Sequence, residues 1–298
     1  MKIVESIEEI PKLEGPIALS IGIFDGVHLG HQMILSKLSK LTRKGGSRVL
    51  LTFSNHPSTL FTPNSPVPQI TSLNQRLDLL KEHGLDLVIV LPFTQEFANQ
   101  SYESFFGYLR TYLPFNHLIV GEDARFGKNQ AGSPEKIHKL GWITEYLSKE
   151  TYHKKAISSG VIRKALQERS LKKVKKMLGR SYSISLPFDK ANIIRESEVQ
   201  YKWVTGTEKL CLLPSGVYAI DLLSKGKPIP AIVFYRGTQS ITGETNLFLT
   251  IYFEKEIPES EHIELVFVSH LHDELDPDFK APSKANLLES LKPEFFPS

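Results

Sequence analysis

The feature that most constrains the fold is a glycine-rich segment, residues 22–31, which separates two hydrophobic patterns of different period. Before it, residues 17–21 read Ile-Ala-Leu-Ser-Ile, an apolar run with the length of a buried strand. After it, residues 32–38 have apolar side chains at the i, i+3, i+4 spacing of an amphipathic helix. A strand that enters a helix through such a turn is typical of α/β proteins, in which phosphate ligands bind at this position.

Glycines and histidines within this turn suit a phosphate site. Gly22, Gly26 and Gly30 allow the backbone to approach a phosphate closely. His28 and His31 are three residues apart, so we expect their side chains to face the same way at the start of the helix. Two imidazoles aimed at one point suit a polyphosphate whose negative charge grows during a reaction. A metal pair and two surface histidines are the alternatives, and the surrounding strand, glycines and helix favour the phosphate site.

Residues 1–182 alternate strand-like and helix-like segments. Apolar strands that are separated by helices form βαβ units, and strands without alternation fit burial on both faces of a parallel sheet. We therefore predict an α/β domain over residues 1–182. The expected strands are 17–23, 49–53, 87–91 and 117–120, and the expected helices are 31–44, 72–83, 101–112 and 134–149.

The pattern changes in residues 183–298. Short strand-like segments alternate with turns there, which predicts a small antiparallel β-barrel followed by a short terminal helix at 284–291. The lysines at 172, 173, 175 and 176, just before this change, fit the solvated face of a helix. The expected strands are 216–223, 229–235, 246–253 and 263–268.

Composition narrows the class of protein. The chain has 298 residues, which suits two domains, and its net charge of +3 is compatible with anionic substrates but too weak to indicate nucleic acid. Cys211 is the only cysteine, so neither a disulfide framework nor a cysteine-rich metal site is expected, and a cytoplasmic location is the simplest. The first residues have no signal-peptide pattern, and no apolar run approaches the about 20 residues of a membrane span. The oligomeric state is left open.

The turn also resembles a family motif. Residues 22–31 match all fixed positions of Gly-x-Phe-Asp-Gly-x-His-x-Gly-His, the characteristic loop of bacterial FAD synthetases of the bifunctional riboflavin kinase/FMN adenylyltransferase type. The resemblance implies a Rossmann-like nucleotidyltransferase domain over 1–182 and a riboflavin-kinase-like barrel over 183–298. It implies AMP transfer from ATP to FMN, with Mg²⁺ brought by ATP and no dedicated metal site on the protein. It assigns His28 and His31 to catalysis, and Phe24, Asp25 and the three glycines to binding; Asp25 either orders the turn or lies near the adenosine.

Three further segments carry the resemblance through the first domain. Residues 52–57 resemble the family's Thr-Phe-x-Pro-His-Pro, with Asn55 in place of a proline, so that Asn55 or His56 is expected to touch ATP or flavin. Residues 121–132 resemble a loop of the flavin pocket, although alanine and glutamine replace an aromatic residue and an arginine. Residues 157–163 resemble Ile-Ser-Ser-Thr-x-Ile-Arg, with Gly160 in place of threonine. The implied binding residues are Asp123, Arg125, Phe126, Gly127, Ser158 and Ser159, and Arg163 is implied as a catalytic contact to phosphate.

In the second domain the resemblance is incomplete. Residues 213–219 match the kinase segment Leu-Pro-x-Gly-Val-Tyr-Ala, and Glu244 stands where the kinase has its general base. The motif Gly-x-Pro-Thr-Ala-Asn, which holds Mg-ATP in the kinase, is missing: a gapless reading puts 201–204 there, and a gapped one uses 189–192. We therefore expect riboflavin kinase activity to be weak or absent. The alternatives are a full bifunctional enzyme, a flavin-binding protein without catalysis, and another nucleotidyltransferase.

Overall fold

The first half of the chain forms a six-stranded sheet in which every pairing is parallel. The computed structural model describes residues 1–42, 45–187, 198–205, 210–239, 245–253 and 262–273. The sheet confirms the predicted parallel α/β domain. Its strand order is β1 (Lys2–Val4), β4 (Leu87–Leu91), β3 (Ser47–Phe53), β2 (Ile17–Ile21), β5 (His117–Gly121) and β6 (Ile143–Leu147).

The strand order reverses at β2. The chain runs from β2 to β3 and β4 on one side of it, and then crosses to β5 and β6 on the other. In open α/β sheets, ligands bind outside the carboxyl ends of the strands at such a switch point. The glycine–histidine turn follows β2 and the segment 121–132 follows β5, so both leave the sheet at this point.

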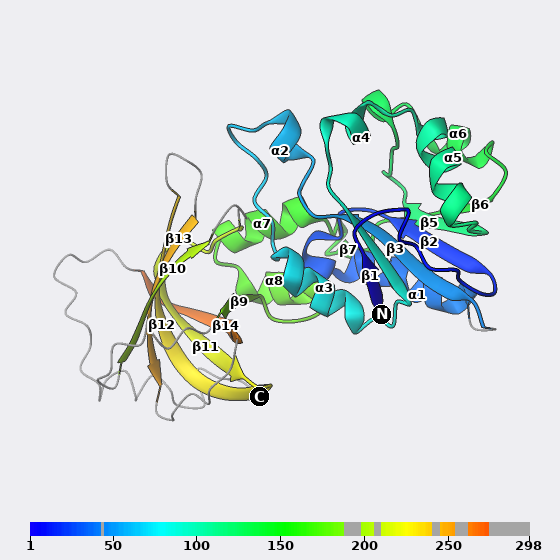
Figure 1. Cartoon of the computed structure of the whole chain (residues 1–298). Coiled ribbons are helices and arrows are strands. Elements are labelled where there is room, and N and C mark those ends of the chain that lie inside the picture. Colours follow the sequence, from blue (N-terminus) through cyan, green and yellow to red (C-terminus); the bar gives the residue numbers. More distant parts are fainter. Residues whose placement is uncertain (43–44, 188–197, 206–209, 240–244, 254–261, 274–298) are drawn as a thin grey trace. The chain divides into compact units, whose positions relative to one another are not determined.

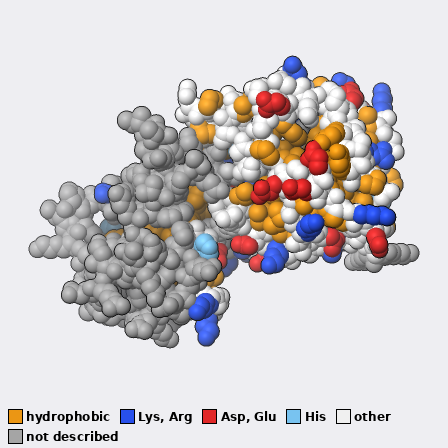
Figure 2. All heavy atoms as spheres, viewed as in Figure 1, with side chains coloured by type: hydrophobic (Ala, Val, Ile, Leu, Met, Phe, Trp, Pro, Cys, Tyr) orange, Lys and Arg blue, Asp and Glu red, His pale blue; other side chains and the backbone are white. Residues whose placement is uncertain are grey.

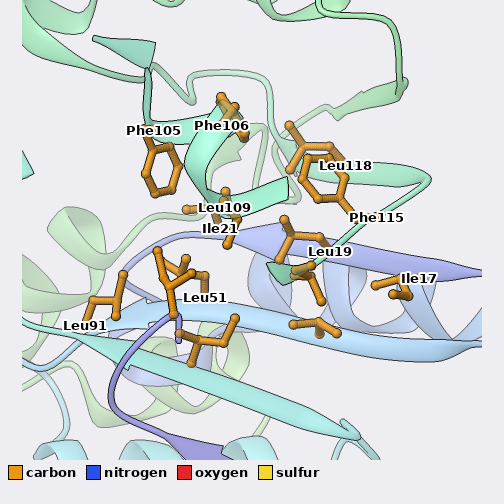
Figure 3. Packing of buried hydrophobic residues seen from close by; sticks show 14 of the residues in the cluster. Ile17, Leu19, Ile21, Leu51, Leu91, Phe105, Phe106, Leu109, Phe115 and Leu118 are labelled. Carbon is orange, nitrogen blue, oxygen red and sulfur yellow. The ribbon is translucent and has the colours of Figure 1, made fainter. Parts of the chain in front are cut away.

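Helices cover both faces of the sheet (Figure 1). Alternate residues along β2 point to opposite faces: Leu19 packs beneath α5, whereas Ala18 packs with α1 and α3. Figure 3 shows Phe105, Phe106 and Leu109 of α5 lying over the β2 side chains. The helices of this half are η1 (Asp25–Val27), α1 (Leu29–Leu41), α2 (Ser58–Phe61), α3 (Leu73–Lys81), α4 (Gln95–Asn99), α5 (Tyr102–Tyr112), η2 (Lys128–Gln130) and α6 (Pro134–His138).

One predicted helix is wrong in its second half. The prediction ran from 134 to 149, but α6 ends at His138 and residues 143–147 form β6, which pairs with β5. Gly141 has a φ of +91°, a left-handed conformation that breaks the helix. The sequence Ile-Thr-Glu-Tyr-Leu that follows is rich in β-branched and aromatic residues, which favour a strand. It pairs with β5 and forms the edge strand of the sheet.

The second half of the chain forms a six-stranded sheet in which every pairing is antiparallel, which confirms the predicted antiparallel β domain. The closure of this sheet into a barrel stays a prediction. All four expected strands are present, and two more were missed, β9 and β10. The predicted terminal helix, 284–291, lies outside the described residues. In sheet order the strands are β10 (Glu198–Thr205), β13 (Thr245–Phe253), β12 (Lys227–Gln239), β11 (Gly216–Ser224), β14 (His262–Asp273) and β9 (Ser183–Pro187).

The chain divides into two compact units. The first comprises Met1–Val67 and Leu73–Ser158, and the second comprises Pro68–Ser72 and Ser159–Ser298. The second unit includes α7 (Ser159–Gln167) and α8 (Leu171–Leu178), which pack on each other, and α8 also contacts β14. A domain boundary after residue 182 remains a prediction.

The surface mixes charges of both signs. Figure 2 shows acidic and basic side chains interspersed with apolar ones on one face of the described residues. On α8 the lysines 172, 175 and 176 are exposed and Lys173 is half-buried, while Leu171, Val174, Met177 and Leu178 are buried, as the amphipathic pattern predicts. Within the described part of the chain, none of the helices has the length and hydropathy needed to cross a membrane.

Candidate functional site

The turn after β2 has a strained backbone. Phe24, Gly26 and Val27 all have positive φ angles, of 55°, 77° and 40°. Glycine adopts this conformation freely, but a β-branched valine rarely does, and such strain persists only where the surrounding structure imposes it. Phe24, Asp25 and Val27 are buried, so the turn is a packed element rather than a surface loop. Backbone strain of this kind gathers at ligand-binding sites.

The two histidines of the motif lie face to face. His28 is the N-cap of α1, and its Nδ1 accepts a hydrogen bond of 3.4 Å from the backbone N–H of His31. Their rings are stacked with centroids 3.7 Å apart, and the ring of Phe24 lies 4.6 Å from that of His31. Helix α1 therefore begins at Leu29, two residues earlier than predicted, because the His28 side chain caps it. The structure brings the imidazole pair together at a helix N-terminus.

His31 is held in its neutral form. Burial is the largest cause that lowers the pKa of its imidazole well below the usual range, and the charges of His28 and Arg76 lower this pKa further. Its Nδ1 is buried without a hydrogen-bond partner among the described residues. A neutral imidazole protonated at Nε2 is able to donate one hydrogen bond to a ligand.

This lowered pKa predicts a loss of stability in acid. The unfolded chain protonates His31 near pH 6.5 while the folded protein does not, so the free energy of unfolding decreases as the pH falls below about 6.5 towards the folded pKa. Denaturant titrations at pH 8 and pH 5.5 on the wild type and on His31→Gln measure this effect. We expect the variant to lose less stability on acidification. Equal losses would show that another group carries the dependence.

The side chains of the segment after β3 bond to neighbouring backbone. Asn55 donates from Nδ2 to the Phe93 carbonyl, at 3.1 Å, and its Oδ1 accepts from the Phe93 N–H, at 2.7 Å. His56 Nδ1 accepts from the backbone N–H of Ser58 and lies 2.8 Å from its hydroxyl, at the start of α2. Asn55 thus joins the chain that follows β3 to the chain that follows β4. A contact of Asn55 or His56 with ATP or flavin stays a prediction.

The segment after β5 is anchored to α5. Asp123 forms an ion pair of 2.7 Å with Lys149, and Arg125 donates to the Ala124 carbonyl at 2.8 Å. Phe126 is only 9% exposed and packs against Phe106 of α5, with ring centroids 5.1 Å apart. Gly127 has a φ of +70°, and a Cβ there would lie 2.4 Å from the Tyr102 backbone nitrogen, so only glycine fits. The predicted flavin contacts of these residues are not tested by this packing.

The serine–arginine segment lies where the two units divide. Ser158 is the last residue of the first unit, and Ser159 begins α7 in the second. Arg163 lies half-buried on α7, whose apolar face is formed by Ile162, Ala165 and Leu166. The predicted approach of Ser159 and Arg163 to the same phosphates as the histidines stays a prediction.

In the second unit, Glu244 lies outside the described residues, as do 189–192. Residues 201–204, the gapless position of the missing motif, lie within β10 and pair with Asn246–Leu249 of β13. The matching segment 213–219 leads into β11, where Tyr218 is fully buried and donates a hydrogen bond to the Pro214 carbonyl. This part of the resemblance therefore lies in the core of the second sheet.

Two residues between β3 and β4 were not singled out from the sequence. Arg76 of α3 is fully buried and donates to the Ile23 and Phe53 carbonyls, at 2.9 and 2.6 Å. Phe61 of α2 is 63% exposed and lies 6.0 Å, ring to ring, from Phe93. One signal in the sequence could have indicated Arg76: it lies three residues after Leu73, on a helix face that otherwise carries leucines.

Metal binding by the protein alone has no candidate in the described residues, since none of their His, Cys, Asp and Glu side chains form a group of three or more.

Comparison with known proteins agrees with the resemblance. The FAD synthetase family model matches residues 10–161, about half of the chain. A bifunctional riboflavin kinase/FMN adenylyltransferase from Buchnera aphidicola is 30% identical over 234 residues, which cover 74% of this chain and 73% of that protein. The Escherichia coli (strain K12) protein of the same name is 30% identical, covering 78% of this chain and 77% of its own length.

A solved structure shows the same fold over nearly the whole chain. The crystal structure of a macrolide-efflux protein from Streptococcus pneumoniae covers 98% of this chain and 96% of its own, with a TM-score of 0.77. At 21% identity this likeness concerns the fold alone. Together with the family match and the two relatives, the glycine–histidine turn places the chain in the FAD synthetase family of nucleotidyltransferases.

Proposed function

We propose that this chain transfers AMP from ATP to FMN, forming FAD and pyrophosphate. The observation that carries the proposal is the stacked pair of His28 and His31, at the N-terminus of α1 and at the point where the strand order reverses. A helix N-terminus and two imidazoles together suit the binding of phosphate. The names of the relatives support the choice of FMN and ATP as substrates.

In the proposed reaction, an FMN phosphate oxygen attacks the α-phosphorus of ATP. One P–O bond forms there as the bond to the β-phosphate oxygen breaks, and pyrophosphate leaves. The attacking oxygen is already anionic near pH 7, so the enzyme needs little general-base help. Its task is to bring two anions together and to stabilise charge on the α-phosphate and the leaving group. His28 and His31 serve this role, and Ser159 and Arg163 bind the β,γ end.

Magnesium enters this scheme with ATP, held by phosphate oxygens, and supplies positive charge to the leaving pyrophosphate. The flavin side of the site is assigned to Asp123, Arg125, Phe126 and Gly127 after β5. Asn55 and His56, after β3, border the same edge of the sheet.

The half of the chain that resembles riboflavin kinase is proposed to be weak or inactive in that reaction. The sequence lacks the Pro-Thr-Ala-Asn motif that holds Mg-ATP, and residues of β10 stand at its gapless position. The alternative is a full bifunctional enzyme, favoured by the relatives' name, by the segment 213–219 and by Glu244 as general base. A flavin-binding protein without catalysis is a third candidate, since four motif positions depart from the family.

Chromatography of flavins distinguishes these functions. The purified chain is incubated with ATP and Mg²⁺ and either FMN or riboflavin. We expect FAD from FMN and little or no FMN from riboflavin. Rapid formation of both FMN and FAD from riboflavin would establish the bifunctional enzyme. Tight flavin binding without FAD or pyrophosphate would refute the adenylyltransferase.

Replacement of Gly30 by alanine is expected to separate activity from stability. A Cβ at Gly30 would lie 3.2 Å from Cε1 and Nδ1 of the His28 ring, so this ring must move by a few tenths of an ångström. Alanine favours the helix by up to about 1 kcal/mol, which offsets the crowding. We expect kcat for FAD formation to fall about tenfold while unfolding stability changes by less than about 1 kcal/mol. Unchanged kcat would show that the His28 ring position is unimportant.

A further inference from the structure

The strongest unused feature of the first unit is the buried guanidinium of Arg76. On α3, Leu73, Leu77 and Leu80 pack into the core on the face that also carries Arg76, and the arginine side chain is fully buried. A buried arginine is rare and costly unless its N–H groups are bonded. Here it donates to two backbone carbonyls, one in the turn after β2 and one at the end of β3.

These two carbonyls mark the places where the candidate site begins. Ile23 is in the turn after β2, one residue before the left-handed Phe24, and Phe53 is the last residue of β3. Arg76 Nη1 lies 2.9 Å from the Ile23 oxygen, and Nη2 lies 2.6 Å from the Phe53 oxygen. The Thr52 hydroxyl also donates to the Ile23 carbonyl, at 3.0 Å. These hydrogen bonds link the strained turn to the end of β3.

We propose that Arg76 is a positioning residue of the adenylyl-transfer site: its planar guanidinium fixes the histidine turn and the end of β3 in one arrangement towards the phosphates. This inference rests on the proposed function for its kinetic consequence only. A guanidinium matches two acceptors at once in a fixed fork, which an ammonium does not. Lysine at this position would keep the charge but not the simultaneous, directed bonds.

The charge of Arg76 has a second consequence for His31. It is one of the causes that lower the pKa of the His31 imidazole, after burial and the charge of His28. Removing this charge alone therefore moves the pKa of His31 upwards, towards its usual value. The titration of His31 reports on the link between Arg76 and the turn without any need for catalysis.

The test compares Arg76→Met, Arg76→Lys and a control in the full-length chain. Arg48→Met is the matched control, because Arg48 lies in β3 at the end opposite to Phe53. Its side chain donates two hydrogen bonds, of 2.9 and 3.0 Å, to the Asp86 carboxylate. NMR of labelled histidine rings gives the His31 pKa, assigned with His31→Gln. Steady-state kinetics with FMN and MgATP give kcat and KM, and thermal melts check folding.

We expect Arg76→Met to raise the His31 pKa and to lower kcat at least tenfold, with a smaller change in KM. Arg76→Lys should keep the His31 pKa near that of the wild type and recover part of kcat. Arg48→Met should leave kcat and the His31 titration unchanged, whatever its effect on melting.

Two results would overturn the proposal. One is an Arg76→Met protein with wild-type kcat and an unshifted His31. The other is an equal pKa rise in Arg76→Met and Arg48→Met, which would reduce Arg76 to general stability. If Arg76→Met does not fold, Arg76→Lys decides: full activity with an unaltered His31 spectrum contradicts the need for a directed fork. If the wild type makes no FAD, the proposed function fails while the His31 titration still tests the positioning role.

Discussion

Replacement of His31 by alanine is expected to lower kcat for FAD formation by roughly 10²-fold or more, the usual effect of losing one transition-state donor. The physical reason lies in the stacked pair: burial keeps the His31 imidazole neutral, and in the proposed mechanism this ring donates one hydrogen bond to phosphate. Alanine removes the donor and also the ring on which His28 rests. Initial rates at saturating FMN and MgATP, followed by chromatography, measure kcat.

The control for this experiment is His138→Ala. His138 is an exposed histidine at the end of α6 in the same unit, so its loss should leave the rate within twofold of the wild type. His31→Gln keeps an N–H donor and is expected to retain more activity than His31→Ala. Near wild-type turnover in His31→Ala, in a protein that melts normally, would remove His31 from the mechanism.

The candidate site could be predicted from the sequence only where its residues are close together along the chain. The turn after β2 was predicted from its glycines and from the change in hydrophobic pattern, from strand before it to helix after it. The structure places both histidines together there. Its contact with Arg76 could not be found in this way, because 53 residues separate Arg76 from Ile23 and only the sheet brings them together. Likewise Asn55 stood out as a departure from the motif, but its two bonds to Phe93 depend on the neighbouring strand.

The fold shows the same division between local and tertiary information. The strands 87–91 and 117–120 were predicted almost residue by residue, because each is a short apolar run that a proline or a glycine follows. Residues 143–147 were assigned to a helix, since a local pattern cannot show that β5 leaves an open edge to pair with. β1 was missed for the same reason: only its pairing with β4 makes a strand of Lys2–Val4.

The largest expected effect on stability is that of Phe106→Ala. Phe106 is 1% exposed, and its ring lies between 5.1 and 6.3 Å from the rings of Phe105, Phe115, Phe126 and Trp142. Removing a fully buried phenyl ring costs about 3–5 kcal/mol, because the transfer free energy is lost and a cavity remains. For a unit of this size that corresponds to a fall in Tm on the order of 10 °C.

Tyr112→Ala on the same helix is the matched control, because Tyr112 is 40% exposed at the end of α5 and should cost no more than about 1 kcal/mol. Phe106→Ala should also affect one segment in particular. Because Phe126 packs against the Phe106 ring, the loop after β5 should become more susceptible to proteolysis in this variant. If calorimetry shows the same loss of Tm in both variants, the buried ring of Phe106 is not the main contribution of α5 to stability. A loss confined to Phe106→Ala, with cleavage within 121–132, would show that the aromatic core stabilises the segment after β5.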